Sequence, residues 1–268
     1  MEIINMWNSV AGECQTEPIL EYYPTTIINN SPKTAVVIFP GGAYRGRAVY
    51  EGQGYAHFFN SLGIDAFVCQ YRVCPHSYPL SLLDARRAVQ YIRYNCEKLD
   101  INPEKIGVIG SSAGGHLIAS LCNIYDDFSD YFVKKDEIDE TEYMPNFHIL
   151  CYPVITFKDF GHQGSKENLL GDKKDDKQLV RYLCIEDRVN NKTPKAFIWH
   201  TFDDSGVNVK NSLVYATALK DNGIQCEVHL YQNGHHGMGL AQNSNSVGQW
   251  TTQLRNWLIH NDLMGGAK

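Results

Sequence analysis

Short apolar runs recur along the chain, and a glycine- or proline-rich turn and then a segment of helical periodicity follow each of them. Most of the runs are apolar throughout, which is typical of parallel strands covered on both faces. They lie at residues 35–39, 65–71, 106–110, 147–155, 196–200 and 226–231. Apolar side chains at helical spacing occur over 85–99, 209–219 and 247–258. This alternation predicts an α/β fold, with a doubly wound, mostly parallel sheet and helices on both faces.

A polar stretch, residues 156–194, interrupts the alternation. Long excursions inside compact domains are usually functional or carry short helices of their own. We therefore expect a small cap-like insertion at about 156–194, with the mixed-charge run 173–177 on its solvated surface. Because α/β domains often reach about 250 residues, we expect residues 1–268 to form a single domain.

Composition and charge exclude several classes of protein. A chain of 268 residues, 43% of them hydrophobic, buries a large core without disulfides or metal. The 24 basic and 30 acidic side chains give a net charge of −6, and the basic residues are scattered, so we expect no nucleic acid partner. No apolar run is long enough for a membrane span, and residues 1–20 lack a signal-peptide pattern. The eight cysteines show no CxxC spacing, which favours reduced thiols and a cytoplasmic location.

The strongest chemical signal is GSSAG at residues 110–114. It fits G-x-S-x-G, in which a strained strand-to-helix turn exposes a serine hydroxyl. Three fixed positions occur by chance in roughly one chain in ten. Here, however, an expected strand precedes the pattern and a helix-like segment, 115–122, follows it. Ser112 is therefore the candidate nucleophile, and the alternative is a turn that merely joins two elements.

A serine nucleophile needs an adjacent base that a carboxylate orients. Asp203 and Asp204 follow the expected strand 196–200, and His235 and His236 follow the strand 226–231. The carboxyl ends of parallel strands meet at one edge of the sheet, where ligands bind. The order serine, acid, histidine predicts a serine hydrolase. Spacing alone leaves open which aspartate and which histidine take part.

An oxyanion hole is expected from PGGA at residues 40–43, directly after the strand 35–39. Glycines let backbone N–H groups point into a site, where they stabilise a developing negative charge. We expect the amide of Gly42 or Ala43 to act with that of Ala113, and the alternative is a plain turn. Tyr44 follows and is a candidate substrate-binding residue.

Other polar residues carry weaker signals. His235 and His236 lack a third ligand at zinc-like spacing, so we expect no metal and no cofactor. His116 and His200 are expected to pack or form hydrogen bonds. The three charged residues of the segment 84–87 are expected at a helix surface, where they anchor loops.

These segments resemble the α/β-hydrolase superfamily and, within it, bacterial acetyl esterases and xylan-deacetylase-like carboxylesterases. The similarity covers about residues 35–240. Its segments are PGGAY at 40–44, EG at 51–52, YRVCP at 71–75, DARRAVQYIR at 84–93, INPEKIGVIGSSAGGHL at 101–117, NLLG at 168–171, TPKAFIWHTFDDSGVNV at 193–209 and GHHGMGL at 234–240. The resemblance implies that Asp204 is the acid and His236 the base. Asn208 departs from the family's usual proline, and Pro40 replaces the histidine of the HGGG form.

The resemblance also implies the activity. It indicates a serine carboxylesterase that hydrolyses short-chain esters, above all acetyl esters, on sugars or xylan-derived oligosaccharides, through an acyl-enzyme on Ser112. An amide hydrolase of the same fold, either an arylformamidase or a small peptidase, remains an alternative. So does a catalytically inactive binding homologue. Expected partners are small-molecule or oligosaccharide esters, without a membrane, and a homo-oligomer is compatible with the sequence.

Overall fold

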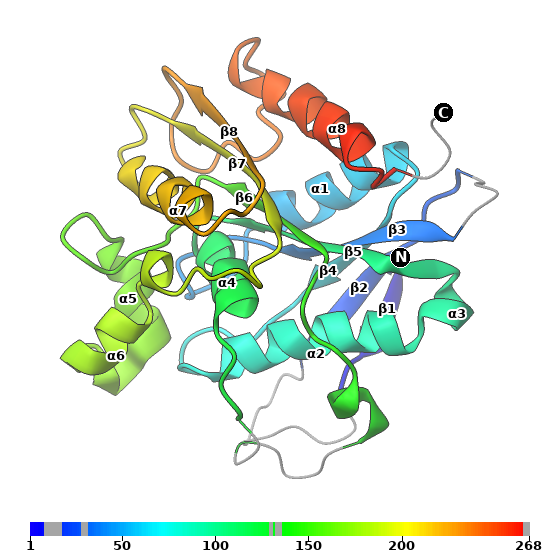
Figure 1. The fold of residues 1–268 in the computed structure, drawn as a ribbon, viewed down its shortest axis with the longest axis horizontal. Coiled ribbons are helices and arrows are strands. Elements are labelled where there is room, and N and C mark those ends of the chain that lie inside the picture. Colours follow the sequence, from blue (N-terminus) through cyan, green and yellow to red (C-terminus); the bar gives the residue numbers. More distant parts are fainter. Residues whose placement is uncertain (8–17, 28–31, 129–130, 132–135, 265–268) are drawn as a thin grey trace.

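One mixed β-sheet organises the computed structural model, which describes residues 1–7, 18–27, 32–128, 131 and 136–264 (Figure 1). Its strand order is β1-β2-β4-β3-β5-β6-β7-β8. The pairings from β4 to β8 are parallel, whereas β2 runs antiparallel to both of its neighbours. The strands are β1 (Glu2–Asn5), β2 (Ile19–Tyr23), β3 (Lys33–Phe39), β4 (Asp65–Cys69), β5 (Ile101–Ser111), β6 (Phe147–Cys151), β7 (Lys195–Thr201) and β8 (Cys226–Tyr231).

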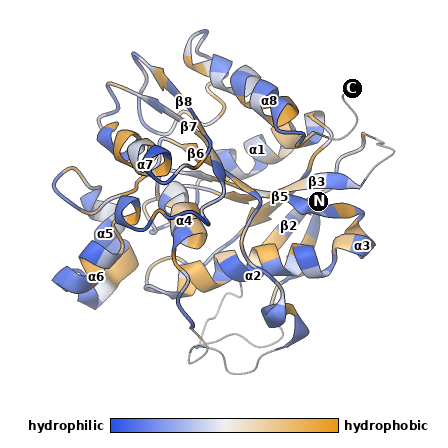
Figure 2. Ribbon diagram, in the orientation of Figure 1, coloured by the Kyte–Doolittle hydropathy of each residue, from blue (hydrophilic) through white to orange (hydrophobic). Residues whose placement is uncertain are grey.

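Helices cover both faces of this sheet. Buried side chains of α2, α4 and α7 pack in one hydrophobic cluster, and those of α1 and α8 pack in a second cluster on the opposite face. The α-helices are α1 (Val49–Ser61), α2 (Leu80–Tyr94), α3 (Cys96–Leu99), α4 (Ala113–Asn123), α5 (Gln163–Leu170), α6 (Lys177–Tyr182), α7 (Lys210–Asp221) and α8 (Trp250–His260). Figure 2 shows hydrophobic and hydrophilic residues alternating along α8, as a helix with one buried side requires.

Successive residues of a central strand contribute to opposite clusters. In β3, Val37 belongs to the cluster beneath α2 and α4, whereas Val36 and Ile38 belong to the cluster beneath α1 and α8. Because strand side chains alternate between faces, a strand buried on both faces must be apolar throughout. The continuous apolar runs of the sequence have this physical origin, and the predicted doubly wound sheet is confirmed.

Strand boundaries differ from the expectations at several ends. The strand expected over 147–155 ends at Cys151, because Tyr152 has φ +37° and Pro153 has no N–H to donate to the sheet. β5 begins five residues earlier than expected, and β8 spans the expected residues. The sequence did not predict β1, β2 and α1; β1 is mostly exposed and therefore lacks a clear apolar run.

The charged residues of α2 require a correction, because we expected them at the helix surface and they are buried. Asp84 accepts hydrogen bonds from the guanidinium of Arg72 at 2.7–3.1 Å. Arg86 donates to two backbone oxygens in the segment directly after α4, and Arg87 donates to Asp136. Their expected role in anchoring loops agrees with these contacts, and their partners compensate for burial of the charges.

Residues 156–194 carry the short helices α5 and α6 and two 3₁₀ turns, which lie together beyond α4 and α7 (Figure 1). Backbone hydrogen bonds join this segment to the rest of the molecule: Tyr78 donates to Leu169 O at 2.8 Å, and Ile185 donates to Ile155 O at 3.1 Å. Among the described residues, no helix is both long and apolar enough to cross a membrane.

Candidate active site

Ser112 occupies the sharp turn between β5 and α4. Its φ of +53° is unusual for a residue with a side chain, and this strained backbone conformation is typical of a nucleophile turn. The turn also needs a glycine at position 114, because a Cβ there would lie 2.0 Å from Phe39 O. The glycine pattern found in the sequence therefore reflects close packing of α4 against the sheet.

The structure brings Ser112, His236 and Asp204 together from three strand ends. Ser112 Oγ lies 2.8 Å from His236 Nε2, and His236 Nδ1 lies 2.7 Å from Asp204 Oδ2. Because a carboxylate only accepts hydrogen bonds, Nδ1 carries the proton and Nε2 is free to accept from the serine hydroxyl. The imidazole side chain is 27% exposed, whereas the Asp204 side chain is 1% exposed. The arrangement can transfer a proton from serine to imidazole at an accessible position.

Asp204 is held by four donors. Its Oδ1 accepts from the N–H groups of Gly206 and Val207 at 2.8 and 2.9 Å, and its Oδ2 accepts from His236 and, at 3.2 Å, from His200 Nε2. Burial alone would raise the pKa of Asp204, but hydrogen bonds from His200, His236 and Val207 outweigh burial and place its pKa well below the usual range. Asp204 is therefore a fixed anion that orients the imidazole.

The neighbouring candidates, Asp203 and His235, lie outside this line of contacts. Asp203 is exposed and accepts hydrogen bonds from Asn233 at 3.0 Å and from the N–H of Gly234 at 2.6 Å. His235 Nδ1 lies 2.8 Å from the backbone oxygen of His236. Asp203 thus ties the acid loop to the histidine loop, a role that its sequence position did not reveal.

The turn at residues 40–44 lies beside Ser112, because a Cβ at Gly41 would be 3.1 Å from the serine Cβ. Gly42 and Ala43 both have positive φ, +136° and +54°. A side chain at Gly42 would also meet Gly46 O at 2.4 Å. In the described part of the chain, the N–H groups of Gly42, Ala43 and Ala113 donate to no protein acceptor. These three groups remain available for an oxygen atom of a ligand.

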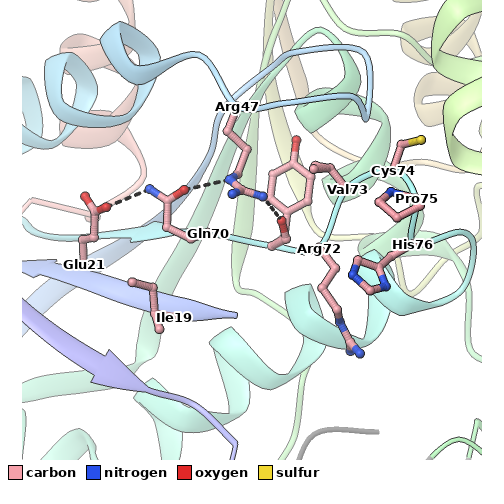
Figure 3. Close-up of a pocket in the computed structure, with 10 residues that line it drawn as sticks. Ile19, Glu21, Arg47, Gln70, Arg72, Val73, Cys74, Pro75 and His76 are labelled. Carbon is pink, nitrogen blue, oxygen red and sulfur yellow. Dashed lines mark hydrogen bonds between the residues drawn. The ribbon is translucent and has the colours of Figure 1, made fainter. Parts of the chain in front are cut away.

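The loop after this turn is fastened by Arg47. Its guanidinium donates to Gln70 Oε1 at 2.7 Å and to Tyr71 O at 2.5 Å, and Gln70 in turn donates to Glu21 at 2.8 Å. Figure 3 shows this chain of contacts along one wall of a hollow of about 430 Å³, which Cys74 and four neighbouring residues line on the opposite side. Ser112 does not line this hollow.

Tyr44 requires a correction. Its side chain is buried, and its hydroxyl lies 2.9 Å from His116 Nδ1, so it faces the interior and does not line an open substrate site. His116 Nε2 donates to Leu183 O at 2.9 Å, and burial lowers the His116 pKa to about 4. Both side chains therefore support the turn from the interior of the protein, and the expected packing role of His116 is confirmed.

Two buried residues behind the site were not selected as functional candidates from the sequence. Glu51, in the first turn of α1, accepts a hydrogen bond from the N–H of Gly41 at 2.5 Å and another from the Tyr152 hydroxyl at 2.7 Å. Burial raises the pKa of Glu51, and the hydrogen bonds from Tyr152 and Gly41 oppose this shift. The Tyr152 ring packs edge-on to His236, with 5.1 Å between ring centroids. The only sequence signal was EG at 51–52, within the family resemblance.

The segment that we expected as a cap also contacts the turn at residues 40–44. Asn168, on α5, donates to Ala43 O at 2.9 Å. His162 precedes α5, and its Nδ1 accepts from the N–H of Ser165 at 3.1 Å, so the imidazole caps this helix. Within the described residues, no group of three or more His, Cys, Asp or Glu side chains could hold a metal ion.

Comparisons with known proteins give the same fold. The chain is 38% identical to the acetyl ester-xyloside bifunctional hydrolase of Caldicellulosiruptor lactoaceticus; the match covers 98% of this chain and 97% of that structure, with a TM-score of 0.92. The acetylxylan esterase of Xylanibacter ruminicola is 31% identical over 85% of this chain and 46% of its own length. Endo-1,4-beta-xylanase B of Butyrivibrio fibrisolvens is 35% identical over 78% of this chain and 33% of its own length.

This chain thus spans between a third and half of these two relatives, so their named activities belong to longer proteins. The mostly parallel sheet with helices on both faces is the α/β-hydrolase fold, as the structural similarity indicates. The family model of BD-FAE matches residues 22–219, which include Ser112 and Asp204 and end before His236. Because that match spans well over half of the sequence, this α/β hydrolase belongs to the BD-FAE family.

Proposed function

We propose that this chain is a serine carboxylesterase that removes short acyl groups, in particular acetyl groups, from sugars or xylan-derived oligosaccharides. The observation that carries the proposal is the line of hydrogen-bond distances from Ser112 through His236 to Asp204. The substrate class rests on the relatives named for acetylxylan and for acetyl ester-xyloside hydrolysis.

Acylation begins when Ser112 Oγ attacks the ester carbonyl carbon and His236 Nε2 accepts the hydroxyl proton. Asp204 stabilises the imidazolium through the hydrogen bond at Nδ1. The N–H of Ala113, together with that of Gly42 or Ala43, donates to the carbonyl oxygen as it becomes negative. The imidazolium then protonates the leaving alcohol oxygen, the carbon–oxygen bond breaks, and the acyl group remains on Ser112.

Deacylation repeats these steps with water. His236 accepts a proton from the water as its oxygen attacks the acyl carbon, and the same amides stabilise the second oxyanion. The imidazolium returns the proton to Ser112 Oγ as the carboxylic acid leaves. Every proton in this cycle is therefore held by a residue of the chain or by the substrates, and the scheme needs no cofactor.

Removing the nucleophile tests the assignment. Ser112→Ala is expected to lower kcat/KM for p-nitrophenyl acetate by about 10⁴- to 10⁶-fold and to abolish labelling by a fluorophosphonate. Ser61→Ala, which changes an exposed serine at the far end of α1, is the matched control and should hydrolyse the ester at the parental rate. Parental turnover by Ser112→Ala would contradict the assignment.

A substrate panel tests the rest of the proposal. We expect p-nitrophenyl acetate and acetylated xylo-oligosaccharide to be turned over faster than N-formylkynurenine, an aminoacyl anilide or esters of acyl chains beyond about eight carbons. Faster turnover of the formyl or anilide substrate would identify an amide hydrolase. An inert protein whose Ser112 resists fluorophosphonate would identify a binding homologue.

We also propose that the esterase acts in the cytoplasm and without nucleic acid. The proposal is supported by the net charge of −6 and by free thiols at the seven cysteines of the described chain, since disulfides are rare in reducing compartments. Cys14 lies outside the described residues. Cell fractionation tests the location, and light scattering on the purified protein tests whether it is a homo-oligomer.

A further inference from the structure

Glu51 is a buried carboxylate next to the proposed oxyanion hole, and the reaction described above gives it no role. It is 2% exposed and uses both oxygens: Oε2 accepts from the N–H of Gly41 at 2.5 Å, and Oε1 accepts from the hydroxyl of Tyr152 at 2.7 Å. A buried carboxylate is costly unless it is well hydrogen-bonded. These two hydrogen bonds therefore compensate for the burial of the Glu51 carboxylate.

The contact with Gly41 determines the orientation of the oxyanion turn. The start of α1 holds the backbone of this residue at both ends: Glu51, in the first turn, accepts from its N–H, and the N–H of Ala48, which precedes the helix, donates to its oxygen at 2.9 Å. The next two residues, Gly42 and Ala43, adopt positive φ and carry the free amides. Because the preceding peptide is fixed, these amides have a fixed direction relative to Ser112.

The contact with Tyr152 extends to the histidine loop. The Tyr152 hydroxyl donates to Glu51 and accepts from the N–H of Gly239 at 3.0 Å. Gly239 lies three residues after His236, against whose ring Tyr152 also packs. One uninterrupted hydrogen-bond path thus runs from the oxyanion turn, through Glu51 and Tyr152, to the loop that carries the base.

We propose that Glu51 is a positioning residue that, through Gly41 and Tyr152, holds the oxyanion turn and the histidine loop in the relative placement that the transition state requires. The inference rests on the proposed esterase function. A misplacement of about 1 Å in such a site costs on the order of 100-fold in rate. Since Glu51 acts through Gly41 and Tyr152, its effect should appear in kcat rather than in KM.

Three substitutions of Glu51 separate the effect of side-chain length from the effect of charge. Glu51→Gln keeps the length and an acceptor for Gly41, and is expected to lower kcat less than tenfold. Glu51→Asp keeps the charge but withdraws the carboxylate by one methylene, and Glu51→Ala removes both contacts. We expect about 100-fold losses of kcat for these two, with KM for p-nitrophenyl acetate within threefold. Glu97→Ala, at an exposed glutamate on α3, is the control and should match the parent.

Rates are expressed per active site, counted by fluorophosphonate labelling, so that misfolded protein does not contribute to the loss. A trifluoromethyl ketone, whose adduct with Ser112 carries an oxyanion, should lose affinity in parallel with kcat. Tyr152→Phe removes the second half of the path and should lower kcat about tenfold. Tyr215→Phe removes another buried hydroxyl, which hydrogen-bonds to Asn123 and His148, and should leave kcat unchanged.

The series has clear outcomes. The inference is supported if kcat is highest in the parent, lower in Glu51→Gln and lowest in Glu51→Asp and Glu51→Ala, and if the affinity for the ketone falls in parallel. Parental kcat per active site in Glu51→Asp and Tyr152→Phe overturns it, and so does a loss confined to KM. If Glu51→Ala does not fold, Glu51→Asp and Tyr152→Phe still test the inference. Turnover by Ser112→Ala is a separate result, which would contradict the proposed function itself.

Discussion

Two buried carboxylates, Asp204 and Asp84, lie in clusters of opposite character. Asp84 is enclosed with Arg72, whose side chain is 2% exposed and which donates to both carboxylate oxygens. Asp204 is equally buried, but its partner His236 is 27% exposed and reaches Ser112. Burial and pairing of a carboxylate therefore do not mark a reactive site. The difference is whether the partner connects the buried charge to an accessible group.

The chemistry of the partner explains this difference. Arginine stays charged and has only donors, so Arg72 can neutralise Asp84 but cannot take a proton from another group. Histidine changes charge near neutral pH and has two distinct nitrogens, so His236 can bind Asp204 with one and accept a proton with the other. We expect changes in the Asp84 cluster to alter stability and changes in the Asp204 cluster to alter rate.

The largest expected effect is at the acid. Asp204→Asn should lower kcat by about 10⁴-fold, because the amide no longer holds the imidazole in the tautomer that accepts a proton from Ser112. Asp203→Asn is the matched control at the neighbouring residue. It should stay within tenfold, since an amide oxygen can still accept from the N–H of Gly234. Steady-state kinetics on p-nitrophenyl acetate measure both, and equal losses would contradict the choice of Asp204.

A smaller effect, on stability alone, is expected at the closed cluster. Arg72→Met leaves Asp84 as an unpaired buried charge and should lower the free energy of unfolding by about 3–5 kcal/mol. Lys105→Met, which breaks the solvent-exposed pair with Asp262, should cost less than about 1 kcal/mol. Denaturant unfolding measures both changes. A fall of kcat per active site beyond threefold in Arg72→Met would break the proposed separation of the two clusters.

A further effect on stability sharpens the comparison through pH. Burial lowers the pKa of His116 to about 4 and that of His148 to about 3, from an ordinary value near 6.5. The unfolded chain therefore binds more protons below pH 6.5, and stability falls as the pH decreases towards 4, by about 3 kcal/mol for His116. The lowered pKa of Asp204 acts in a different window: its stabilisation persists above about pH 4 and is lost only below it.

Thermal unfolding between pH 7 and pH 4.5 measures this dependence. Exchanging His148 for leucine should make stability fall less steeply over that range, because one titrating group is removed. A melting temperature that is independent of pH between 6.5 and 4.5 would show that the two histidines do not remain neutral in the folded protein.

The sequence predicted the parts of the fold and site that depend on local pattern. Apolar runs located the parallel strands, because strands covered on both faces have no polar side, and the glycines around Ser112 marked the turn into α4. The edge strand β1 was missed, because it is mostly exposed and has no such run. Tyr44 was assigned to the substrate site, whereas the strained turn directs its side chain inward to His116.

By itself, the sequence determined the α/β alternation and the nucleophile turn, and it restricted the acid and the base to two adjacent pairs of residues, from which the family resemblance selected Asp204 and His236. Only the tertiary structure decided that Asp204 and His236 face each other while Asp203 and His235 do not, and that Glu51 lies behind the oxyanion turn. The physical reason is that neighbouring residues in a loop project in different directions. Which one meets a partner depends on backbone dihedrals and on packing between segments that are distant in sequence.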